Sequence, residues 1–407
     1  MTFAGFLRDN APYLTVGALL TFVSSFGQTH FISIFAGEIQ AEFGLSHGAW
    51  GTLYAIGTMA SAAVMIWAGA LTDVVRVRVL ALFVLGGLAA ACLLMAALPV
   101  LWGLPVVIFF LRLFGQGMSS HIATVAMARW FVAARGRALA IASLGFSVGE
   151  AFLPVIFVAL LAVTPWRFLW VVAAVIALMI LPVVVRLLRA ARPPQSVAKE
   201  TDATGMLGHQ WARRDALGHW LFWLMVPAII GPAAFGTAFF FHQVHLADVK
   251  GWTHLELVSL FPIYTATGIF SLLASGWLID RYGTGWLMPL AQVPLGLGFL
   301  VLGATRSLLG ATLDVVLMGL TFGAIATLPA AGWAEFYGTR QLGAIKALAT
   351  AVMVLGSAIG PGLTGGLIDW GILFPDQMFG IALWFFGVTA LLSVGLARAR
   401  TLLPQAS

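Results

Sequence analysis

Charged residues are scarce in this 407-residue chain. Only 9% of the residues are Asp, Glu, Lys or Arg, whereas 61% are hydrophobic and the mean hydropathy is +1.00. A soluble domain carries about 25% charged residues, because its surface must be hydrated. A chain with so few charges has too little polar surface to face water. We therefore expect lipid to be its solvent, which excludes the soluble classes of protein.

Cysteine and the motifs of enzyme chemistry are also nearly absent. The single cysteine, Cys92, excludes an internal disulfide and any metal site built from several cysteines. The chain has no glycine-rich loop ending in Lys-Ser or Lys-Thr, so ATP is not expected as its energy source. It also lacks the paired carboxylates or nucleophiles that a membrane enzyme needs. We expect no enzymatic activity, no cofactor, no metal and, despite a net charge of +6, no nucleic-acid partner.

Apolar runs long enough to cross a bilayer recur along the chain. About 20 apolar residues in a helix span the hydrocarbon core, where every backbone group must be paired. The first run is too long for a signal peptide and lacks a small-residue cleavage site, so it is expected to remain as a helix. The pattern predicts twelve transmembrane helices, at 11–35, 49–71, 79–98, 104–127, 138–162, 166–188, 217–241, 255–279, 285–304, 307–332, 342–367 and 376–397.

These helices divide into two groups of six. We predict an N-terminal six-helix bundle at 1–188, a cytoplasmic linker at 189–216 and a C-terminal six-helix bundle at 217–407. The linker is the only sizeable polar segment. With the N-terminus inside, 17 of the 21 Lys and Arg residues fall in cytoplasmic segments, as the positive-inside rule requires. We therefore expect an inner-membrane protein with both termini in the cytoplasm.

Short motifs repeat between the two groups at nearly one offset. A Gly-x-x-x-Asp motif at 69–73 recurs 207 positions later at 276–280. The glycines at 145 and 149 recur 211 positions later at 356 and 360. Agreement at two separate places favours an internal duplication over chance. Repeated six-helix halves are typical of transporters, whose substrate site lies near the midplane of the membrane.

Two ionisable residues fall deep inside predicted helices, where each costs roughly 2.5–3.5 kcal/mol on insertion scales. Arg112 is about eight residues from the outer end of the fourth helix, and Glu150 is about twelve from the inner end of the fifth. At 1.5 Å per residue both approach the midplane on sequential, antiparallel helices, so the two side chains could meet. In one interpretation Arg112 holds a substrate anion while Glu150 gains and loses a proton. The alternative is a static pair that joins two helices.

Other polar residues are weaker candidates for the same site. Gln116 lies about 40° from Arg112 around the fourth helix, so both are expected on one face. Gln28 and His30 lie about 200° apart on the first helix and are not expected to face the cavity together. The residues predicted to bind substrate are Arg112, Gln116, Gln28, His30 and Tyr264.

Two further residues are expected to play no part in that site. His121 lies on the opposite side of the fourth helix from Arg112 and is expected to be a packed, hydrogen-bonded histidine. Asp314 lies near the outer end of the tenth predicted helix and is expected to be solvated.

With these motifs the whole chain resembles the major facilitator superfamily. That family has a Gly-x-x-x-Asp-Arg/Lys-x-Gly signature after the second helix, often repeated after the eighth. Residues 276–283 match the signature, whereas 69–76 match its first glycine and its aspartate. The resemblance implies that the aspartates lie against helix N-termini, stabilised by the helix dipole, and act as a conformational latch. The residues of this latch are Gly69, Asp73, Asp280 and Arg281.

A narrower resemblance involves the fourth and fifth helices. The Arg112-to-Gly117 segment is similar to an intramembrane signature of the superfamily, and residues 130–167 are similar to its monocarboxylate-porter branch. The resemblance implies an all-α membrane protein with the major facilitator fold, two pseudo-symmetric six-helix bundles that rock about a central site. The drug-antiporter signature Gly-Pro-x-x-Gly-Gly is absent from the fifth helix, where Glu150 follows Gly149.

The predicted function is secondary active transport of a small, monocarboxylate-like organic anion by alternating access, coupled to protons. The first half offers one deep cation and the second offers none, which favours a monoanion over a dicarboxylate. The alternative is a proton antiporter that exports drugs or metabolites. The expected partners are a small-molecule substrate, a proton or other coupling ion and the lipid bilayer, with the chain as a monomer.

Overall fold

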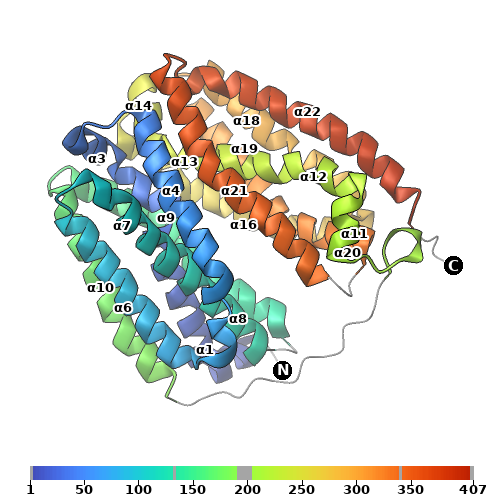
Figure 1. Cartoon of the computed structure of the whole chain (residues 1–407), viewed down its shortest axis with the longest axis horizontal. Coiled ribbons are helices and arrows are strands. Elements are labelled where there is room, and N and C mark those ends of the chain that lie inside the picture. The colour runs from blue at the N-terminus through green and yellow to red at the C-terminus, as the bar shows by residue number, and fades with distance from the viewer. Residues whose placement is uncertain (1–2, 132–133, 190–203, 339–341, 404–407) are drawn as a thin grey trace. The chain divides into compact units, whose positions relative to one another are not determined.

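The computed structural model describes residues 3–131, 134–189, 204–338 and 342–403, with the side chains of a few of them, including Asp73, left undescribed. The chain forms two compact units, residues 1–198 and 199–407. Both are built from helices (Figure 1). Part of the linker predicted at 189–216 lies outside the described residues. Its described part contains the short helical turn η6 (Met206–Gly208) and most of α11 (Arg213–Gly218).

The first helix of unit 1 is broken, where the sequence pattern predicted one helix at 11–35. It runs as α1 (Phe3–Ser24) and continues, after Gln28, as α2 (Thr29–Ile32) and α3 (Ala36–Phe43), with short 3₁₀ turns between them. Gln28 has extended backbone angles, φ −88° and ψ 155°. The two parts of the span, Gly5–Gly27 and Thr29–Phe43, meet at a bend of 50°.

Close packing against the fourth span accompanies this break. A Cβ atom at Gly27 would overlap the carbonyl oxygen of Leu111 and would lie 2.8 Å from the Cα atom of Gly115. The chain can approach so closely because Gly27 and Gly115 have no side chains. The fourth span also changes form there, to the π-helix η4 (Leu111–Ser119), and π-helical segments often occur at functional sites.

The other helices of unit 1 follow the predicted order. Their bounds agree with the predicted spans to within a few residues at most ends. They are α4 (His47–Ala68), α5 (Leu71–Val74), α6 (Val77–Ala97), α7 (Leu104–Phe110), α8 (Ser120–Trp130), α9 (Arg135–Leu161) and α10 (Trp166–Leu187).

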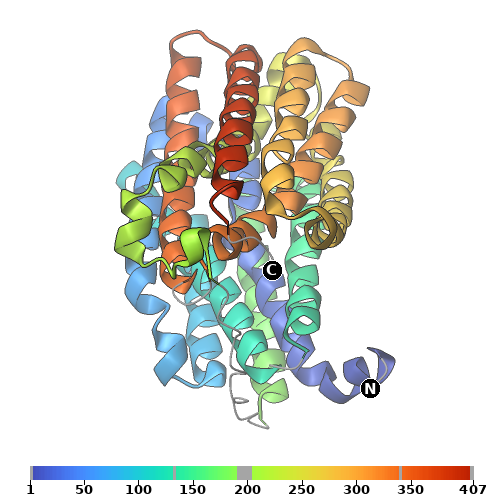
Figure 2. The same cartoon turned by 90° about the vertical axis from the view of Figure 1, so that its right-hand side faces the viewer.

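Unit 2 contains a second series of long helices, several of which run lengthwise beside one another in Figure 2. The tenth predicted span, at 307–332, divides near Thr327 into two helices. The helices of unit 2 are α12 (Trp220–Gly231), η7 (Pro232–Gly236), α13 (Thr237–Phe241), α14 (Gln243–Lys250), α15 (His254–Val258), α16 (Phe261–Tyr282), α17 (Thr284–Leu290), α18 (Val293–Ala304), α19 (Leu308–Ile325), α20 (Leu328–Tyr337), α21 (Leu342–Asp369) and α22 (Phe374–Arg400).

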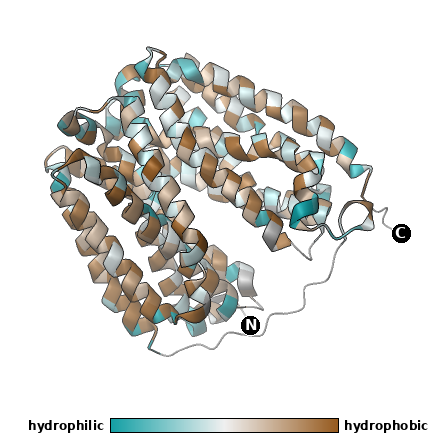
Figure 3. Cartoon of the chain, viewed as in Figure 1, coloured by the Kyte–Doolittle hydropathy of each residue, from teal (hydrophilic) through white to brown (hydrophobic). Residues whose placement is uncertain are grey.

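Length and composition suit these helices to a membrane. Among the described residues eleven helices are long and apolar enough to cross a bilayer, and the bent first span makes a twelfth. Figure 3 shows hydrophobic residues along most of the helix lengths and hydrophilic residues gathered near several ends. Large apolar side chains are widely exposed, for example Phe83 (75%) and Leu383 (71%). Such a surface is stable against acyl chains, as the composition predicted.

Glycines bring two helix pairs into close contact, one in each unit. In unit 1, a Cβ atom at Gly145 of α9 would overlap the carbonyl oxygen of Ala18 in α1. In unit 2, a Cβ atom at Gly360 of α21 would overlap the carbonyl oxygen of Ala234 in η7. The glycines of the internal repeat therefore lie where helices approach each other most closely. The corresponding helices of unit 2 pack in the same way, at the positions where the glycine repeat occurs.

Candidate functional site

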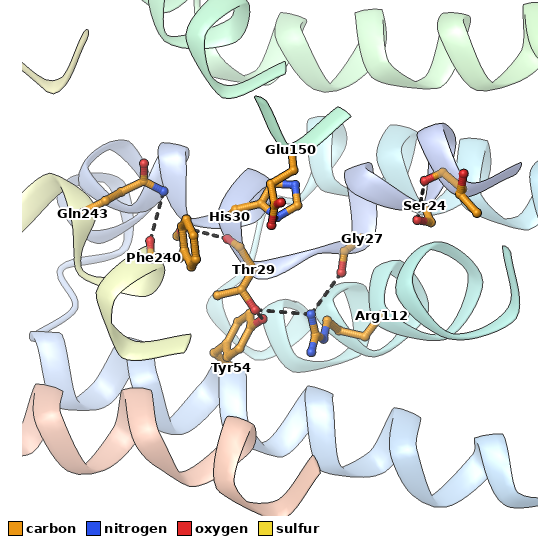
Figure 4. A network of polar contacts seen from close by, with 11 residues as sticks. Ser24, Gly27, Thr29, His30, Tyr54, Arg112, Glu150, Phe240 and Gln243 are labelled. Carbon is orange, nitrogen blue, oxygen red and sulfur yellow. Dashed lines mark hydrogen bonds and ion pairs between the residues drawn. The ribbon is translucent and has the colours of Figure 1, made fainter. Parts of the chain in front are cut away.

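Polar side chains of unit 1 gather where the broken first span passes the fourth (Figure 4). Arg112, on η4, is only 3% exposed. Its Nη1 atom donates hydrogen bonds to the carbonyl oxygen of Gly27 (3.2 Å) and to Oγ1 of Thr29 (3.3 Å). Both acceptors flank Gln28, at the break in the helix. The break therefore provides a polar surface for a cation that would otherwise be buried in apolar protein.

Tyr54 of α4 completes the surroundings of this cation. Its hydroxyl group is hydrogen-bonded to Oγ1 of Thr29 at 2.6 Å. The guanidinium carbon of Arg112 lies 5.5 Å from the centre of the Tyr54 ring, within the range of a cation–π interaction. Tyr54 is fully buried, so its ring and hydroxyl group hold a defined position. Helices α2, α4 and η4 together fix the guanidinium group.

No ion pair joins Arg112 and Glu150 among the described residues, so the interpretation as a static pair of these two residues is wrong. Glu150 of α9 instead approaches His30, with 3.9 Å between Oε1 and Nδ1, an ion-pair distance when the imidazole is protonated. The two side chains are only 13% and 5% exposed. That interpretation considered only the depth of the two residues along the fourth and fifth helices and left out the first helix. The bend after Gly27 brings His30 beside Glu150, and the hydrogen bonds of Arg112 go to the first span.

Arg112 has little electrostatic compensation in unit 1. It has no carboxylate within ion-pair distance among the described residues, and its Nε atom has no hydrogen-bond partner there. A buried charge without an opposite charge is costly unless a ligand supplies one. Because the cation is fixed, largely dehydrated and not neutralised, the site suits an anion.

The two glutamines predicted for the site lie beside it. Gln28 is half-buried at the break in the first span, and Gln116 is half-buried one turn along η4 from Arg112. The backbone nitrogen of Gln116 would lie 2.7 Å from a Cβ atom at Gly27, so the two segments are in close contact. Neither amide side chain bonds to another residue in the part of the chain that the structure describes. Both amides are available to a ligand.

Tyr264, the fifth residue predicted to bind substrate, belongs to unit 2. It lies on α16, is 6% exposed and packs edge-on against the rings of Phe240 and Phe322, with centres 5.4 Å and 6.1 Å apart. This aromatic packing accounts for its burial. Within the described ranges no group of three or more His, Cys, Asp and Glu residues could hold a metal ion.

The loop after α4 is held by two side chains from α8. Nε2 of His121 is hydrogen-bonded to the carbonyl oxygen of Gly69 at 3.2 Å, and Nη1 of Arg129 donates to the carbonyl oxygen of Thr72 at 2.7 Å. His121 is thus the hydrogen-bonded histidine that its position on the helix predicted. The side chain of Asp73, which was predicted for the latch, lies outside the described residues.

The equivalent loop after α16 is held by an acidic residue that the sequence pattern did not identify. Glu335 of α20 accepts hydrogen bonds from the backbone nitrogen (3.1 Å) and the hydroxyl group (2.6 Å) of Thr284. Glu335 follows Arg129 by 206 positions, close to the repeat offset, and this is the signal that could have revealed it. Asp280 and Arg281 end α16, and the Arg281 guanidinium lies 5.6 Å from the centre of the Trp277 ring.

The prediction that Asp314 is solvated is also wrong. The residue is fully buried in α19, and neither carboxyl oxygen has a hydrogen-bond partner among the described residues. Its Oδ1 atom lies against Gly298 of α18, where an added Cβ would come within 2.6 Å of it. Its distance from the helix end suggested exposure, but it lies on the face that packs against α18. An ionised carboxylate without a partner would be costly in this position.

Comparisons with known proteins agree with this architecture. The model of the Major Facilitator Superfamily matches residues 17–361. A comparison with curated proteins found no match.

Two solved structures share the fold, although their sequences are too distant to indicate more. A bacterial homolog of the human lysosomal transporter Spinster, inward-facing and unoccupied, has a TM-score of 0.71 at 15% identity, covering 98% of this chain and 99% of that chain. The nucleoside transporter NupG has a TM-score of 0.70 at 12% identity, covering 95% and 98%. The chain belongs to the Major Facilitator Superfamily, and its fold is the all-helical membrane fold of that superfamily's transporters.

Proposed function

We propose that this protein is a secondary active transporter of a small organic monoanion across the inner membrane, coupled to protons. The observation that carries the proposal is the environment of Arg112. This buried guanidinium is held by Gly27, Thr29 and Tyr54 and has no carboxylate partner among the described residues. A carboxylate substrate would supply the missing negative charge and could bond to the guanidinium on two sides.

The pair formed by His30 and Glu150 is the proposed proton-coupling element. Intramembrane pairs of His and acidic residues commonly serve as proton relays, because each exchanges a proton at little cost while the other is near. Both residues belong to the two spans that pack on either side of the Gly145 contact, α9 and the first span. Binding of an anion at Arg112 and protonation of Glu150 would therefore both change contacts of the first span, which carries Gly27, Thr29 and His30.

The proposed class of substrate follows from the number of buried cations at the site in unit 1. Unit 1 offers one buried cation, which suits a single carboxylate with an apolar body. The similarity of residues 130–167 to monocarboxylate porters points the same way. The two solved structures are of transporters, but at 15% and 12% identity they support the fold and not a substrate. Movement of the two halves around the site by alternating access completes the proposed mechanism.

The proposal is tested first by ligand binding. The purified protein, in lipid nanodiscs, is screened by thermal shift against monocarboxylates, dicarboxylates, amines and sugars at two pH values. We expect stabilisation by monocarboxylates that is lost in Arg112→Gln. Arg186→Gln is the matched control, because Arg186 is exposed at the end of α10 and makes the same change of charge outside the site.

Transport is measured next, as uptake of the stabilising compound into proteoliposomes. Uptake in the wild type and in Arg186→Gln, with none in Arg112→Gln, supports the proposal. Stabilisation by amines or by structurally diverse drugs, unchanged in Arg112→Gln, would reject it and favour the alternative of a drug or metabolite exporter.

A further inference from the structure

A cavity of about 390 Å³ lies entirely within unit 2. It is bordered by α12, η7, α17, α19, α20, α21 and α22, and most of its lining is apolar. Met225, Met288 and Trp333 form buried parts of its wall, with exposed fractions of 1%, 7% and 1%. A volume of this size, an apolar lining and a few polar groups are the usual properties of a small-molecule site. None of the residues considered above for the anion site of unit 1 belongs to it.

Gln292 supplies a directed polar group to this cavity. The residue is 3% exposed, and its Nε2 atom donates a hydrogen bond to the carbonyl oxygen of Ala228 at 3.3 Å. That carbonyl needs a donor, because Pro232, four residues later in the same span, has no N–H group. The bond fixes the orientation of the amide.

The other atom of this amide remains unsatisfied. Oε1 of Gln292 is buried and has no hydrogen-bond partner in the described part of the chain. A buried acceptor without a partner costs about 1–3 kcal/mol. A ligand carrying an N–H or O–H group in the cavity would recover that cost. The amide is therefore an acceptor fixed in place for a donor group.

A positive charge lies at the exposed side of the cavity. Lys346, Thr350 and Met353 line it from α21 and are exposed. Their spacing of four and three residues places them on one face of the helix. Lys346 forms no ion pair with any described residue. Its ammonium group is thus free to meet an anion at the rim, while the body of that molecule lies against the apolar wall.

We propose that this cavity is a second ligand site, which binds an amphipathic organic anion. The apolar body occupies the space lined by Met225, Met288 and Trp333. A donor group meets Oε1 of Gln292, and the anionic group meets Lys346. The lining of this cavity shares no residue with the anion site of Arg112, and the inference does not depend on the transport function proposed above.

The test uses three related probes with the full-length protein in nanodiscs. Indole-3-acetate has an apolar body, an N–H donor and a carboxylate. 1-Naphthaleneacetate keeps the body and the carboxylate but lacks the donor, and tryptamine replaces the carboxylate with an amine. Equilibrium binding of each radiolabelled probe is measured. We expect saturable binding in the order indole-3-acetate, 1-naphthaleneacetate, tryptamine.

Variants assign the binding to this cavity. Lys346→Gln should weaken both carboxylates about tenfold, and Lys346→Arg should restore them, since the residue is exposed and its replacement leaves the fold intact. Gln292→Leu should weaken indole-3-acetate but not 1-naphthaleneacetate. In the Arg112→Gln protein, which lacks the anion site of unit 1, a saturable component should remain for both carboxylates, and Lys346→Gln should weaken that component, because Arg112 does not line this cavity. Saturable binding with this pattern supports the site. Absence of saturable binding at millimolar concentrations, or binding that is lost in Arg112→Gln and unchanged in Lys346→Gln, would overturn it.

Discussion

Single residues show most clearly what position along a helix does and does not reveal. Arg112 and Glu150 could be recognised from the sequence because a charge inside a long apolar run has few structural explanations. Their partners could not. His30 reaches Glu150 only because the first span bends by 50° after Gly27, and this bend depends on contacts with Leu111 and Gly115, far away in the sequence.

Asp314 also shows that position along a helix does not reveal what a side chain packs against. Its distance from the end of the helix was a fair guide to depth but not to the direction in which the side chain points. Glycine at position 298 of α18 leaves room for a carboxyl group between two packed helices. A residue that looked solvated is therefore fully buried.

We expect Asp314→Asn to leave the melting temperature of the purified protein within about 2 °C of the wild type. We expect the buried carboxyl group to be protonated, because a charge there would be costly. An amide of the same shape then removes no charge and no hydrogen bond to a described residue. The measurement is thermal unfolding in detergent at neutral pH.

Glu335→Gln is the contrasting variant. Because Glu335 accepts two hydrogen bonds from Thr284, its replacement should destabilise the protein by about 1–3 kcal/mol. Equal effects of the two substitutions would contradict this account.

Helices as whole elements were well anticipated where they are straight. Spans such as Trp166–Leu187 and Trp220–Phe241 agree with the predicted ranges to within three residues, because a long apolar run can form only a helix in lipid. The breaks were not anticipated. The division of the first span at Gln28 and that of the tenth span near Thr327 follow from tertiary contacts, for which a hydropathy pattern has no signal.

Glycine contacts between helices give the prediction at this scale. Gly145→Ala should destabilise the protein by about 1–3 kcal/mol, because the new methyl group would overlap the Ala18 carbonyl oxygen and force α1 away from α9. Gly86→Ala is the matched control, since nothing lies within 4 Å of a Cβ atom there and alanine favours the helix. Thermal unfolding of both variants provides the measurement. A Gly145→Ala variant as stable as Gly86→Ala would show that the close contact with α1 is not formed.

The latch is also an element-scale proposal. In unit 1 the loop after α4 is held by a cation, Arg129, and in unit 2 the loop after α16 is held by an anion, Glu335. We propose that Asp280 and Arg281 contribute to the same loop. Asp280→Asn is expected to slow transport severalfold while the affinity for substrate stays within about twofold, because Asp280 belongs to unit 2 and is not one of the residues that hold Arg112. Comparison of uptake rates with binding constants distinguishes the two effects, and a parallel loss of binding would count against a latch.

At the scale of the whole molecule, composition alone predicted the membrane fold. A chain with 9% charged residues and twelve apolar runs has few alternatives, and the internal repeat pointed to two six-helix halves. The family match and the solved structures agree with that architecture. What composition could not supply is the set of contacts inside each unit, including the acceptor of Gln292 and the cavity that it lines.

Orientation is the molecular property that remains a prediction. The distribution of Lys and Arg places both termini in the cytoplasm. We therefore expect a fluorescent protein fused to the C-terminus to fluoresce and alkaline phosphatase fused there to be inactive. A phosphatase fused after Lys250, in a predicted outer loop, should be active and serves as the internal control. The opposite pattern would reverse the predicted topology.

The central claim is that Glu150, beside His30, couples proton movement to the passage of an anion held by Arg112. The most direct measurement uses proteoliposomes with a trapped pH-sensitive dye, to which a monocarboxylate from the thermal-shift screen is added. The account predicts substrate-dependent proton entry in the wild type and in the exposed control Glu256→Gln. In Glu150→Gln proton entry should be lost, while exchange of labelled substrate across the membrane continues. Proton entry at the wild-type rate in Glu150→Gln would contradict the claim.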